Sequence, residues 1–178
     1  MSVCVITGPM FSGKTTTLLS KINDSIQCHG REKTLCLKPS IDNRYDTRKI
    51  VTHTGDSIDC LSIPNLATVL VPQNVVNIFI DECQFFPDLL QFVCSHRNKN
   101  ITVAGLSEDF KQEQFGETLD VIGIADDVIL LRSTCGWCFK DTAGHTARVS
   151  SALYEPQVLV GHNNYFPICE KCLQIMRR

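Results

Sequence analysis

Residues 8 to 15 read G-P-M-F-S-G-K-T and match the phosphate-loop pattern G-x-x-x-x-G-K-[ST] at every fixed position. An apolar run at residues 3–7 precedes the motif and predicts a buried strand, and a helical pattern follows at residues 14–29. Glycines at positions 8 and 13 let the backbone curl so that successive N–H groups face phosphate oxygens. Strand, loop and helix in this order predict a nucleoside-triphosphate site, to which the helix adds the positive end of its dipole.

Each position of this loop has an expected role. The Lys14 ammonium reaches the β- and γ-phosphates in such loops, and the Thr15 hydroxyl binds Mg²⁺. The residues expected here to contact ATP or its metal ion are Gly8, Pro9, Met10, Phe11, Ser12, Gly13, Lys14 and Thr15.

Apolar runs and helical patterns alternate along the rest of the chain. Further strands are expected at residues 34–38, 75–80, 101–106 and 128–131, and a further helix at about 87–95. Residues 40–57 are polar and rich in turn formers, which predicts a flexible loop. Continuous apolar strands that alternate with helices predict a parallel sheet with helices on both faces. The expected fold is therefore α/β, a P-loop sheet of the RecA-like kind with ligands at the carboxyl ends of its strands.

Length and composition indicate a soluble globular protein with one main domain. The chain has 178 residues, of which 43% are hydrophobic and 20% are charged, and these values are ordinary for such proteins. The net charge of −2 offers no bulk attraction to nucleic acid or acidic membranes, which weighs against a motor that tracks DNA. No apolar run approaches the ~20 residues that a membrane span needs, and a strand begins where a signal peptide would stand. We expect a cytoplasmic protein that binds neither nucleic acid nor membranes.

The second informative site is the acidic pair Asp81-Glu82, which ends the predicted strand 75–80. An acidic residue at the tip of a buried strand in a P-loop protein is the expected Mg²⁺ partner, and we assign that role to Asp81. Glu82 would then lie beside the γ-phosphate, where a carboxylate can accept a proton from the attacking oxygen. If that oxygen belongs to water the protein is an ATPase, and if it belongs to a bound hydroxyl the protein is a kinase. A solvated acidic pair without a chemical role is the alternative.

Residues 81–84, D-E-C-Q, also match the D-E-x-Q pattern of nucleic-acid-dependent ATPases. Such motors usually have a second similar domain, a basic groove and arginine fingers, whereas this chain has one domain's length and an acidic balance. Phe85 and Phe86 follow the acidic pair, and Leu106 and Phe115 follow the next strand. Aromatic rings near a phosphate acceptor suit stacking on a small planar base, although each ring taken alone fits a core position as well.

Four of the ten cysteines form two C-x-x-C pairs that are separated by thirty residues. Such tight turns each direct two sulfurs at one point, which suits a tetrahedral Zn²⁺ ion. We expect a closed structural zinc site; a thiol-redox pair is the alternative, because the gap exceeds the usual ribbon spacing. The expected ligands are Cys135, Cys138, Cys169 and Cys172. The remaining cysteines are expected to be small buried hydrophobes, namely Cys4, Cys28, Cys36, Cys60, Cys83 and Cys94.

The order of these motifs resembles the type II thymidine kinases, the class found in cells, bacteria and large DNA viruses. Met10-Phe11 inside the phosphate loop and Q-F-F-P-D after the acidic pair are specific to the resemblance, because phosphate binding in general does not require them. The similarity runs from residue 3 to residue 172. It rests on residues 8–15, D-N-R-Y (42–45), I-D-E-C-Q-F-F-P-D (80–88), F-G (115–116), C-G-W-C-F (135–139), G-x-x-x-Y (161–165) and the second cysteine pair (169–172).

This resemblance implies that the chain phosphorylates thymidine on its 5′-hydroxyl with ATP and Mg²⁺, for nucleotide salvage. It implies that Glu82 is the catalytic base and that Arg44 lies near the phosphates. The residues implied to contact the nucleoside are Met10, Phe85, Leu106, Phe115, Thr146, Val158, Leu159, Val160 and Tyr165.

The resemblance also implies a division of the chain. Residues 1–133 would form the P-loop ATP-binding domain, and residues 134–178 a small domain anchored by zinc. Residues 139–168, between the cysteine pairs, would form a lasso that closes over the nucleoside. The family is usually tetrameric and is inhibited by its end product, thymidine triphosphate.

Two features of the lasso depart from the family pattern. The run Thr146-Ala147-Arg148 replaces a T-K-R-like run and is displaced by one extra residue after Cys138. Val160 stands where the family commonly has the first glycine of a pair, so a close backbone approach to the base would require Val160 to keep an ordinary φ.

Two readings from other classes remain beside the kinase: a nucleic-acid-stimulated ATPase, and a zinc-binding module whose nucleotide fold has lost its activity. The second is weakened because the phosphate loop and the acidic pair are intact.

Overall fold

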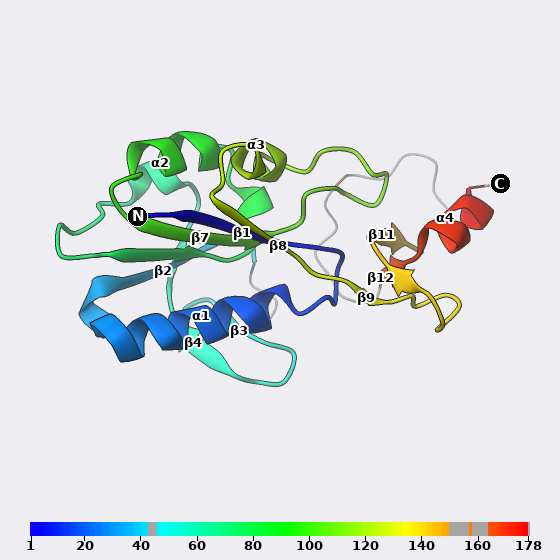
Figure 1. The fold of residues 1–178 in the computed structure, drawn as a ribbon, viewed down its shortest axis with the longest axis horizontal. Helices are drawn as coiled ribbons and strands as arrows, with labels where there is room; N and C mark the ends of the chain where they lie inside the picture. Colours follow the sequence, from blue (N-terminus) through cyan, green and yellow to red (C-terminus); the bar gives the residue numbers. More distant parts are fainter. Residues whose placement is uncertain (43–45, 150–156, 158–163, 178) are drawn as a thin grey trace.

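A parallel β-sheet forms the centre of the protein in the computed structural model, which describes residues 1–42, 46–149, 157 and 164–177 (Figure 1). Its six strands lie in the order β5-β2-β6-β7-β1-β8, and every neighbouring pair is parallel. The strands are β1 (Val3–Thr7), β2 (Thr34–Pro39), β5 (Leu61–Ile63), β6 (Asn77–Ile80), β7 (Asn100–Gly105) and β8 (Asp127–Leu130). All residues of β1 and β6 are buried, which explains why both read as continuous apolar runs.

Helices cover both faces of this sheet, as the sequence predicts (Figure 1). Helix α1 (Lys14–His29) packs on one face, where Leu18, Leu19 and Ile22 join a buried cluster. Helices α2 (Leu89–Ser95) and α3 (Thr118–Ile122) lie on the other face over a larger cluster. Short 3-10 turns stand at Arg31–Lys33, Leu66–Thr68 and Cys83–Phe85.

The parallel register brings the two informative motifs to one edge of the sheet. Strand β7 lies between β1 and β6, and it pairs Ile6 with Ala104 and Ile80 with Val103. The phosphate loop after β1 and the acidic pair after β6 therefore leave the sheet at the same carboxyl edge. This is the edge at which parallel α/β sheets bind ligands.

The expected flexible loop at residues 40–57 is wrong in its second half. A hairpin forms there from β3 (Lys49–Val51) and β4 (Ser57–Asp59), with Ile50 paired to Ile58. Ile50 is 1% exposed and packs into the cluster beneath α1, and half-buried Ile58 packs against the same cluster, so both strands hold the hairpin on the body of the protein. Strands of three residues are too short to give a period that a sequence pattern can reveal. The edge strand β5 is equally short and was missed for the same reason.

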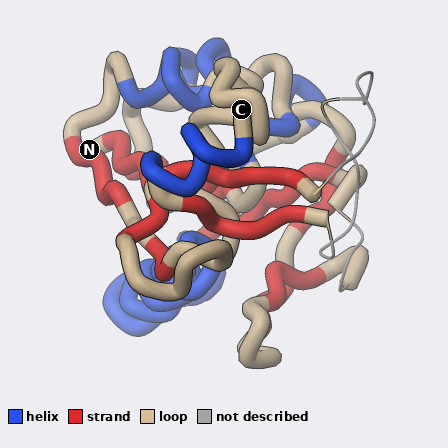
Figure 2. The backbone as a smooth tube through the Cα atoms, turned by 90° about the vertical axis from the view of Figure 1, so that its right-hand side faces the viewer, coloured by secondary structure: helices blue, strands red, loops and turns tan. Residues whose placement is uncertain are grey.

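The C-terminal part contains two small antiparallel sheets and one helix. Strand β9 (Ser133–Thr134) pairs with β10 (Thr142–Ala143), and β11 (His145–Arg148) pairs with β12 (Tyr165–Ile168), which leads into α4 (Glu170–Met176). Figure 2 looks onto this end of the molecule, with α4 nearest the viewer. A separate buried cluster supports this part and includes Ala143, Ala147, Ile168 and Leu173. We propose, as the sequence suggests, that residues 1–133 and 134–178 act as two units.

Two of the six scattered cysteines are not buried. Cys28 near the end of α1 and Cys94 near the end of α2 are exposed, which contradicts the expectation for both, because each lies on the polar side of its helix. Cys60 is half-buried, and Cys4, Cys36 and Cys83 are buried as predicted. Among the residues that the structure describes, no helix combines the length and the apolar character needed to cross a membrane.

Candidate active site

The phosphate loop connects β1 to α1 in the conformation that its glycines allow. Gly8 and Gly13 have φ values of 149° and 85°. Lys14 turns back over the loop, and its Nζ donates to the carbonyl oxygens of Gly8 and Pro9 at 3.1 and 2.7 Å. The buried Ser12 Oγ has no hydrogen-bond partner among the described residues. A buried polar atom without a partner in this loop suits a bound phosphate oxygen.

Asp81 and Thr15 form the second element of the site. Asp81 follows β6 and is 5% exposed, and the Thr15 hydroxyl at the start of α1 lies 3.3 Å from each of its carboxylate oxygens. A hydroxyl and a carboxylate beside a phosphate loop supply the oxygen ligands that Mg²⁺ prefers. The residues present therefore fit the expected metal ion.

Glu82 has an unusual backbone conformation. Its φ and ψ are 48° and 44°, the left-handed region that residues other than glycine rarely enter. Its Oε2 accepts a hydrogen bond from Gln84 Nε2 at 2.6 Å. Such strained residues cluster at functional sites, because the surrounding structure must hold them in place.

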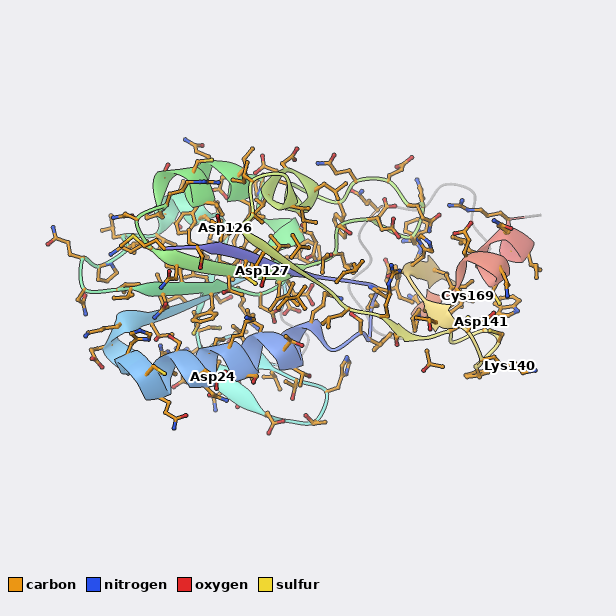
Figure 3. All side chains as sticks on the ribbon, in the orientation of Figure 1. Asp24, Asp126, Asp127, Lys140, Asp141 and Cys169 are labelled. Atoms are coloured by element: carbon orange, nitrogen blue, oxygen red, sulfur yellow. The ribbon has the colours of Figure 1, made fainter. Side chains whose placement is uncertain are left out.

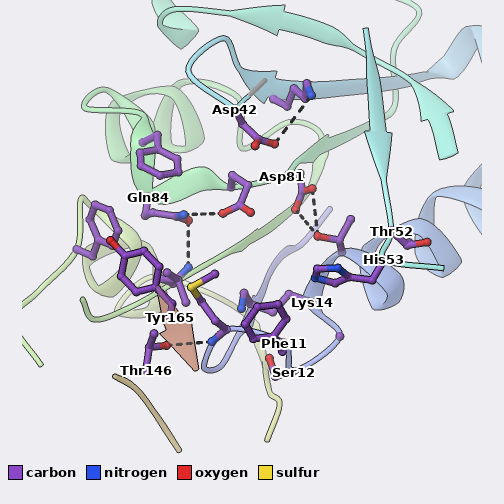
Figure 4. Close-up of a pocket in the computed structure, with 18 of the residues that line it drawn as sticks. Phe11, Ser12, Lys14, Asp42, Thr52, His53, Asp81, Gln84, Thr146 and Tyr165 are labelled. Atoms are coloured by element: carbon purple, nitrogen blue, oxygen red, sulfur yellow. Dashed lines mark hydrogen bonds and ion pairs between the residues drawn. The ribbon is translucent and has the colours of Figure 1, made fainter. Parts of the chain in front are cut away.

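A single pocket contains the phosphate loop, the acidic pair and an aromatic cluster (Figure 4). The rings of Phe85 and Phe115 meet edge to face, with centroids 5.4 Å apart. On this side the pocket is lined by the predicted nucleoside residues that the structure describes, namely Met10, Phe85, Leu106, Phe115, Thr146 and Tyr165. On the phosphate side it is lined by Phe11, Ser12, Gly13, Lys14, Thr15, Asp81 and Glu82.

The lasso contacts this pocket through β11 and β12. The Thr146 hydroxyl accepts a hydrogen bond from the Met10 N–H at 2.9 Å. Arg148 is 3% exposed, and its guanidinium carbon lies 3.8 Å from the centre of the Phe110 ring, while its Nη1 donates to the Tyr165 hydroxyl at 3.3 Å. Arg148 thus supports two aromatic residues of the pocket wall from behind.

Several residues of the pocket were missed by the sequence analysis. The β3–β4 hairpin brings His53 to the mouth, where its ring lies 5.2 Å from that of Phe11. Lys38, at the end of β2, is 2% exposed and lies 3.9 Å from the carboxylate of Asp42. Gln157 of the lasso donates to Asp109 Oδ2 at 2.9 Å. The signal at Lys38 was its place at the end of an apolar strand; nothing in the sequence marked His53.

Four of the predicted site residues lie outside the described part of the chain: Arg44, Val158, Leu159 and Val160. Their assigned roles stay predictions.

The four cysteines of the C-x-x-C pairs come together at the C-terminal end, where Cys169 is labelled in Figure 3. Their sulfurs all lie within 4.8 Å of one another, and tetrahedral zinc–thiolate bonds would place them about 3.8 Å apart. Burial opposes ionisation of the Cys135 thiol, but backbone N–H groups of Cys138 and Cys169 lower its pKa to about 6. Burial and hydrogen bonds from the other thiols raise the pKa of Cys172 to about 12. A cluster that stabilises one thiolate and resists further negative charge fits a bound dication.

A phosphate loop, a buried carboxylate beside it and an aromatic pocket on a parallel sheet define a P-loop nucleotide-binding protein, with a four-cysteine cluster that could hold a metal ion. The family model for thymidine kinase matches residues 1–173. The chain is 37% identical to thymidine kinase a of Arabidopsis thaliana over 182 residues, covering 96% of this chain and 74% of that protein. It is 34% identical to a thymidine kinase of Pseudothermotoga lettingae over 173 residues, covering 94% of this chain and 92% of that protein.

A thymidine kinase of Oryza sativa subsp. japonica is 35% identical over 176 residues, which are 94% of this chain and 64% of the rice protein. This chain thus spans less than two thirds of the length of that relative. The chain belongs to the thymidine kinase family and is an enzyme.

Proposed function

We propose that the enzyme transfers the γ-phosphoryl group of ATP to the 5′-hydroxyl of thymidine, giving thymidine monophosphate for DNA precursor salvage in the cytoplasm. The observation that carries this proposal is the pocket that Glu82 lines together with the phosphate loop and the aromatic cluster. A base in that position can reach a hydroxyl group on a nucleoside whose ring occupies the aromatic side. A water-activating ATPase would not need the aromatic side.

Each residue of the phosphate side has a proposed task. Backbone N–H groups of residues 8–15 and the Lys14 ammonium bind the phosphates and counter the charge that develops on them. Thr15 and Asp81 would hold Mg²⁺, which would supply positive charge to neutralise the phosphates. Glu82 accepts the proton of the 5′-hydroxyl as that oxygen attacks the phosphorus, and the bond from phosphorus to the bridging oxygen of ADP breaks. Arg44 is proposed to add a positive charge near the phosphates.

The nucleoside side is proposed to select the base. Phe115 would stack on thymine, with Phe85 against its edge, since these rings already meet at 5.4 Å. The zinc-anchored lasso is proposed to close this side. Main-chain groups of the lasso are proposed to hydrogen-bond the base. The other residues proposed to contact the nucleoside are Met10, Leu106, Thr146, Val158, Leu159, Val160 and Tyr165.

We also propose that thymidine triphosphate inhibits the enzyme and that the enzyme is a homotetramer. One pocket that accepts both a base and phosphate groups could hold the base and the triphosphate of one such molecule together. Light scattering gives the mass of the assembly, and a monomeric active enzyme would refute the tetramer. Thymidine kinetics with added thymidine triphosphate test the inhibition.

The substrate preference tests the proposed function. Loss of the thymine methyl group in deoxyuridine should lower kcat/KM by roughly 10–200-fold, the usual range for one methyl in an apolar pocket. Deoxycytidine should be rejected by ~10⁴-fold or more, because its exocyclic amine and unprotonated N3 would leave buried polar groups unpaired. Phosphoryl transfer from labelled ATP measures the ranking. Efficient use of deoxycytidine, or ATP hydrolysis that rises with single-stranded DNA, would refute the thymidine kinase assignment.

A further inference from the structure

The side chain of Gln84 connects Glu82 to the opposite wall of the pocket. Its Nε2 donates to Glu82 Oε2 at 2.6 Å, and its Oε1 accepts from the Leu106 N–H at 3.0 Å (Figure 4). An ionised carboxylate can only accept, and a backbone N–H can only donate, so the two partners fix which way the amide points. Gln84 is 4% exposed, so water does not compete effectively for these bonds.

The packing around Gln84 leaves it little freedom. A Cβ atom on Gly105 would lie 2.5 Å from Gln84 Oε1, and one on Gly116 would lie 2.2 Å from the Gln84 carbonyl oxygen. Two neighbouring positions therefore accept only glycine, which lets β7 and the segment after Phe115 approach Gln84 closely. The segments that hold the Gln84 side chain also contain Leu106 and Phe115. These two residues line the proposed nucleoside side of the pocket, and we call them the nucleoside wall.

We propose that Gln84 is a positioning residue, which holds the Glu82 carboxylate in register with the nucleoside wall at Leu106 and Phe115. This inference rests on the proposed role of Glu82 as base. The bond from Gln84 fixes the position of one Glu82 carboxylate oxygen, and the left-handed backbone fixes the direction in which the side chain leaves the chain. Proton acceptance requires a carboxylate placed within hydrogen-bond reach of the hydroxyl, so a small displacement lowers turnover.

Other charged groups share the pocket with Glu82. From the phosphate loop comes Lys14, from β2 and the following turn Lys38 and Asp42, from β3 Lys49, after β6 Asp81, and after β7 Asp109. None of these supplies the amide donor that Gln84 does. A change confined to residue 84 leaves this set of charges in place.

The decisive variant is Gln84→Glu. A glutamate keeps an oxygen that accepts from Leu106, but it replaces the amide donor with a second carboxylate against Glu82. Two carboxylates in contact repel each other, so the Glu82 carboxylate should be pushed out of its place. We expect kcat for thymidine to fall roughly 10–100-fold. The KM for ATP should change little.

Gln91→Glu is the matched control, because Gln91 is an exposed glutamine on α2 and the substitution adds the same charge. This control should keep the wild-type kcat and KM values. Gln84→Met removes both hydrogen bonds at similar volume, and we expect it to lower kcat by a smaller factor than Gln84→Glu, because it adds no charge. It also serves if Gln84→Glu does not fold.

The outcomes separate the two proposals. A folded Gln84→Glu enzyme with the wild-type kcat would overturn the positioning role and leave thymidine kinase activity intact. Gln84→Met with wild-type kcat would do the same. A wild-type enzyme that does not phosphorylate thymidine would overturn the proposed function itself.

Discussion

The hydroxyl oxygen of Thr146 accepts a hydrogen bond from the backbone N–H of Met10 at 2.9 Å, across 136 positions of the sequence. Met10 belongs to the phosphate loop, and Thr146 belongs to β11 of the lasso. This bond connects the C-terminal part of the protein to the loop that is proposed to bind ATP. The conformation of the phosphate loop and the position of the lasso are therefore linked at one atom pair.

Removing that hydrogen bond should weaken the binding of both substrates. Thr146→Val keeps the shape of the side chain but leaves the Met10 N–H without its acceptor, at a cost of about 1 kcal/mol in this half-buried position. We expect the KM for thymidine to rise roughly 5-fold, with a smaller rise for ATP. Steady-state kinetics measure both. Thr146→Ser keeps the hydroxyl and is the control; if it loses as much as Thr146→Val, the hydrogen bond is not the cause.

Glu82→Gln tests the proposed base. The amide keeps the size of the side chain but cannot accept the proton of the 5′-hydroxyl, so turnover should fall roughly 10²–10⁴-fold. ATP binding, measured by calorimetry or by quenching of a fluorescent analogue, should be nearly unchanged because the phosphate loop is untouched. A folded variant with almost full activity would remove the base assignment.

The sequence predicts the central strands of the sheet well because they are buried on both faces. Strands β1 and β6 are apolar at nearly every position, and the phosphate loop marks the end of the first strand and the start of the first helix. The hairpin of β3 and β4 escapes prediction because each strand has only three residues. Its packing through Ile50 and Ile58 depends on long-range contacts, which leave no periodic signal in the chain.

Site residues that belong to a short motif can be predicted from the sequence. Site residues whose roles depend on the three-dimensional arrangement of the chain cannot. The phosphate loop, Asp81 and the four-cysteine cluster follow from residue type and spacing. The roles of Gln84 and Arg148 depend on partners that lie far away in the sequence, Leu106 and Phe110. No local pattern shows that a glutamine two residues after the acidic pair will turn back to it.

Zinc should be a permanent part of the protein. Metal analysis should return about one zinc ion per chain, as for a closed four-cysteine site. Cys169→Ser should then loosen thymidine binding more than ATP binding, because the cluster lies at the end of the lasso and the phosphate loop lies elsewhere. Binding measured for each substrate separately distinguishes the effects. Unchanged thymidine affinity in metal-free protein would contradict this role.

Thiol reactivity should sort the ten cysteines into three groups. Exposed Cys28 and Cys94 should react quickly with a disulfide reagent at pH 8. Burial raises the pKa of Cys4, and it raises the pKa of Cys36 to about 11 and those of Cys60 and Cys83 to about 12. The reactive thiolates of these four cysteines are therefore scarce at pH 8, and the native protein should protect them.

The zinc ligands form the third group and should react only after a chelator removes the metal. We expect two thiols to react at once and four more after chelation. Fast reaction of all ten in the folded protein would show that the cysteine pairs hold no metal.

Gly116 offers a test of how closely the Phe115 segment must approach Gln84. Its φ of 58° disfavours any side chain, and an added Cβ would also lie 2.2 Å from the Gln84 carbonyl oxygen. Gly55, in the β3–β4 turn, has a φ of 92° with nothing within 4 Å of an added Cβ. Gly55→Ala should therefore lower the free energy of unfolding by about 1 kcal/mol, because only the left-handed backbone conformation disfavours the alanine.

Gly116→Ala should lower it by about 2 kcal/mol more, since the backbone of two segments must move apart. Because Phe115 moves with Gly116, the KM for thymidine should rise as well, whereas Gly55→Ala should leave it unchanged. Denaturant unfolding and steady-state kinetics on both variants give the comparison. If both variants lost the same stability and the KM for thymidine did not change, the backbone near Gln84 would accommodate the added Cβ without altering the pocket.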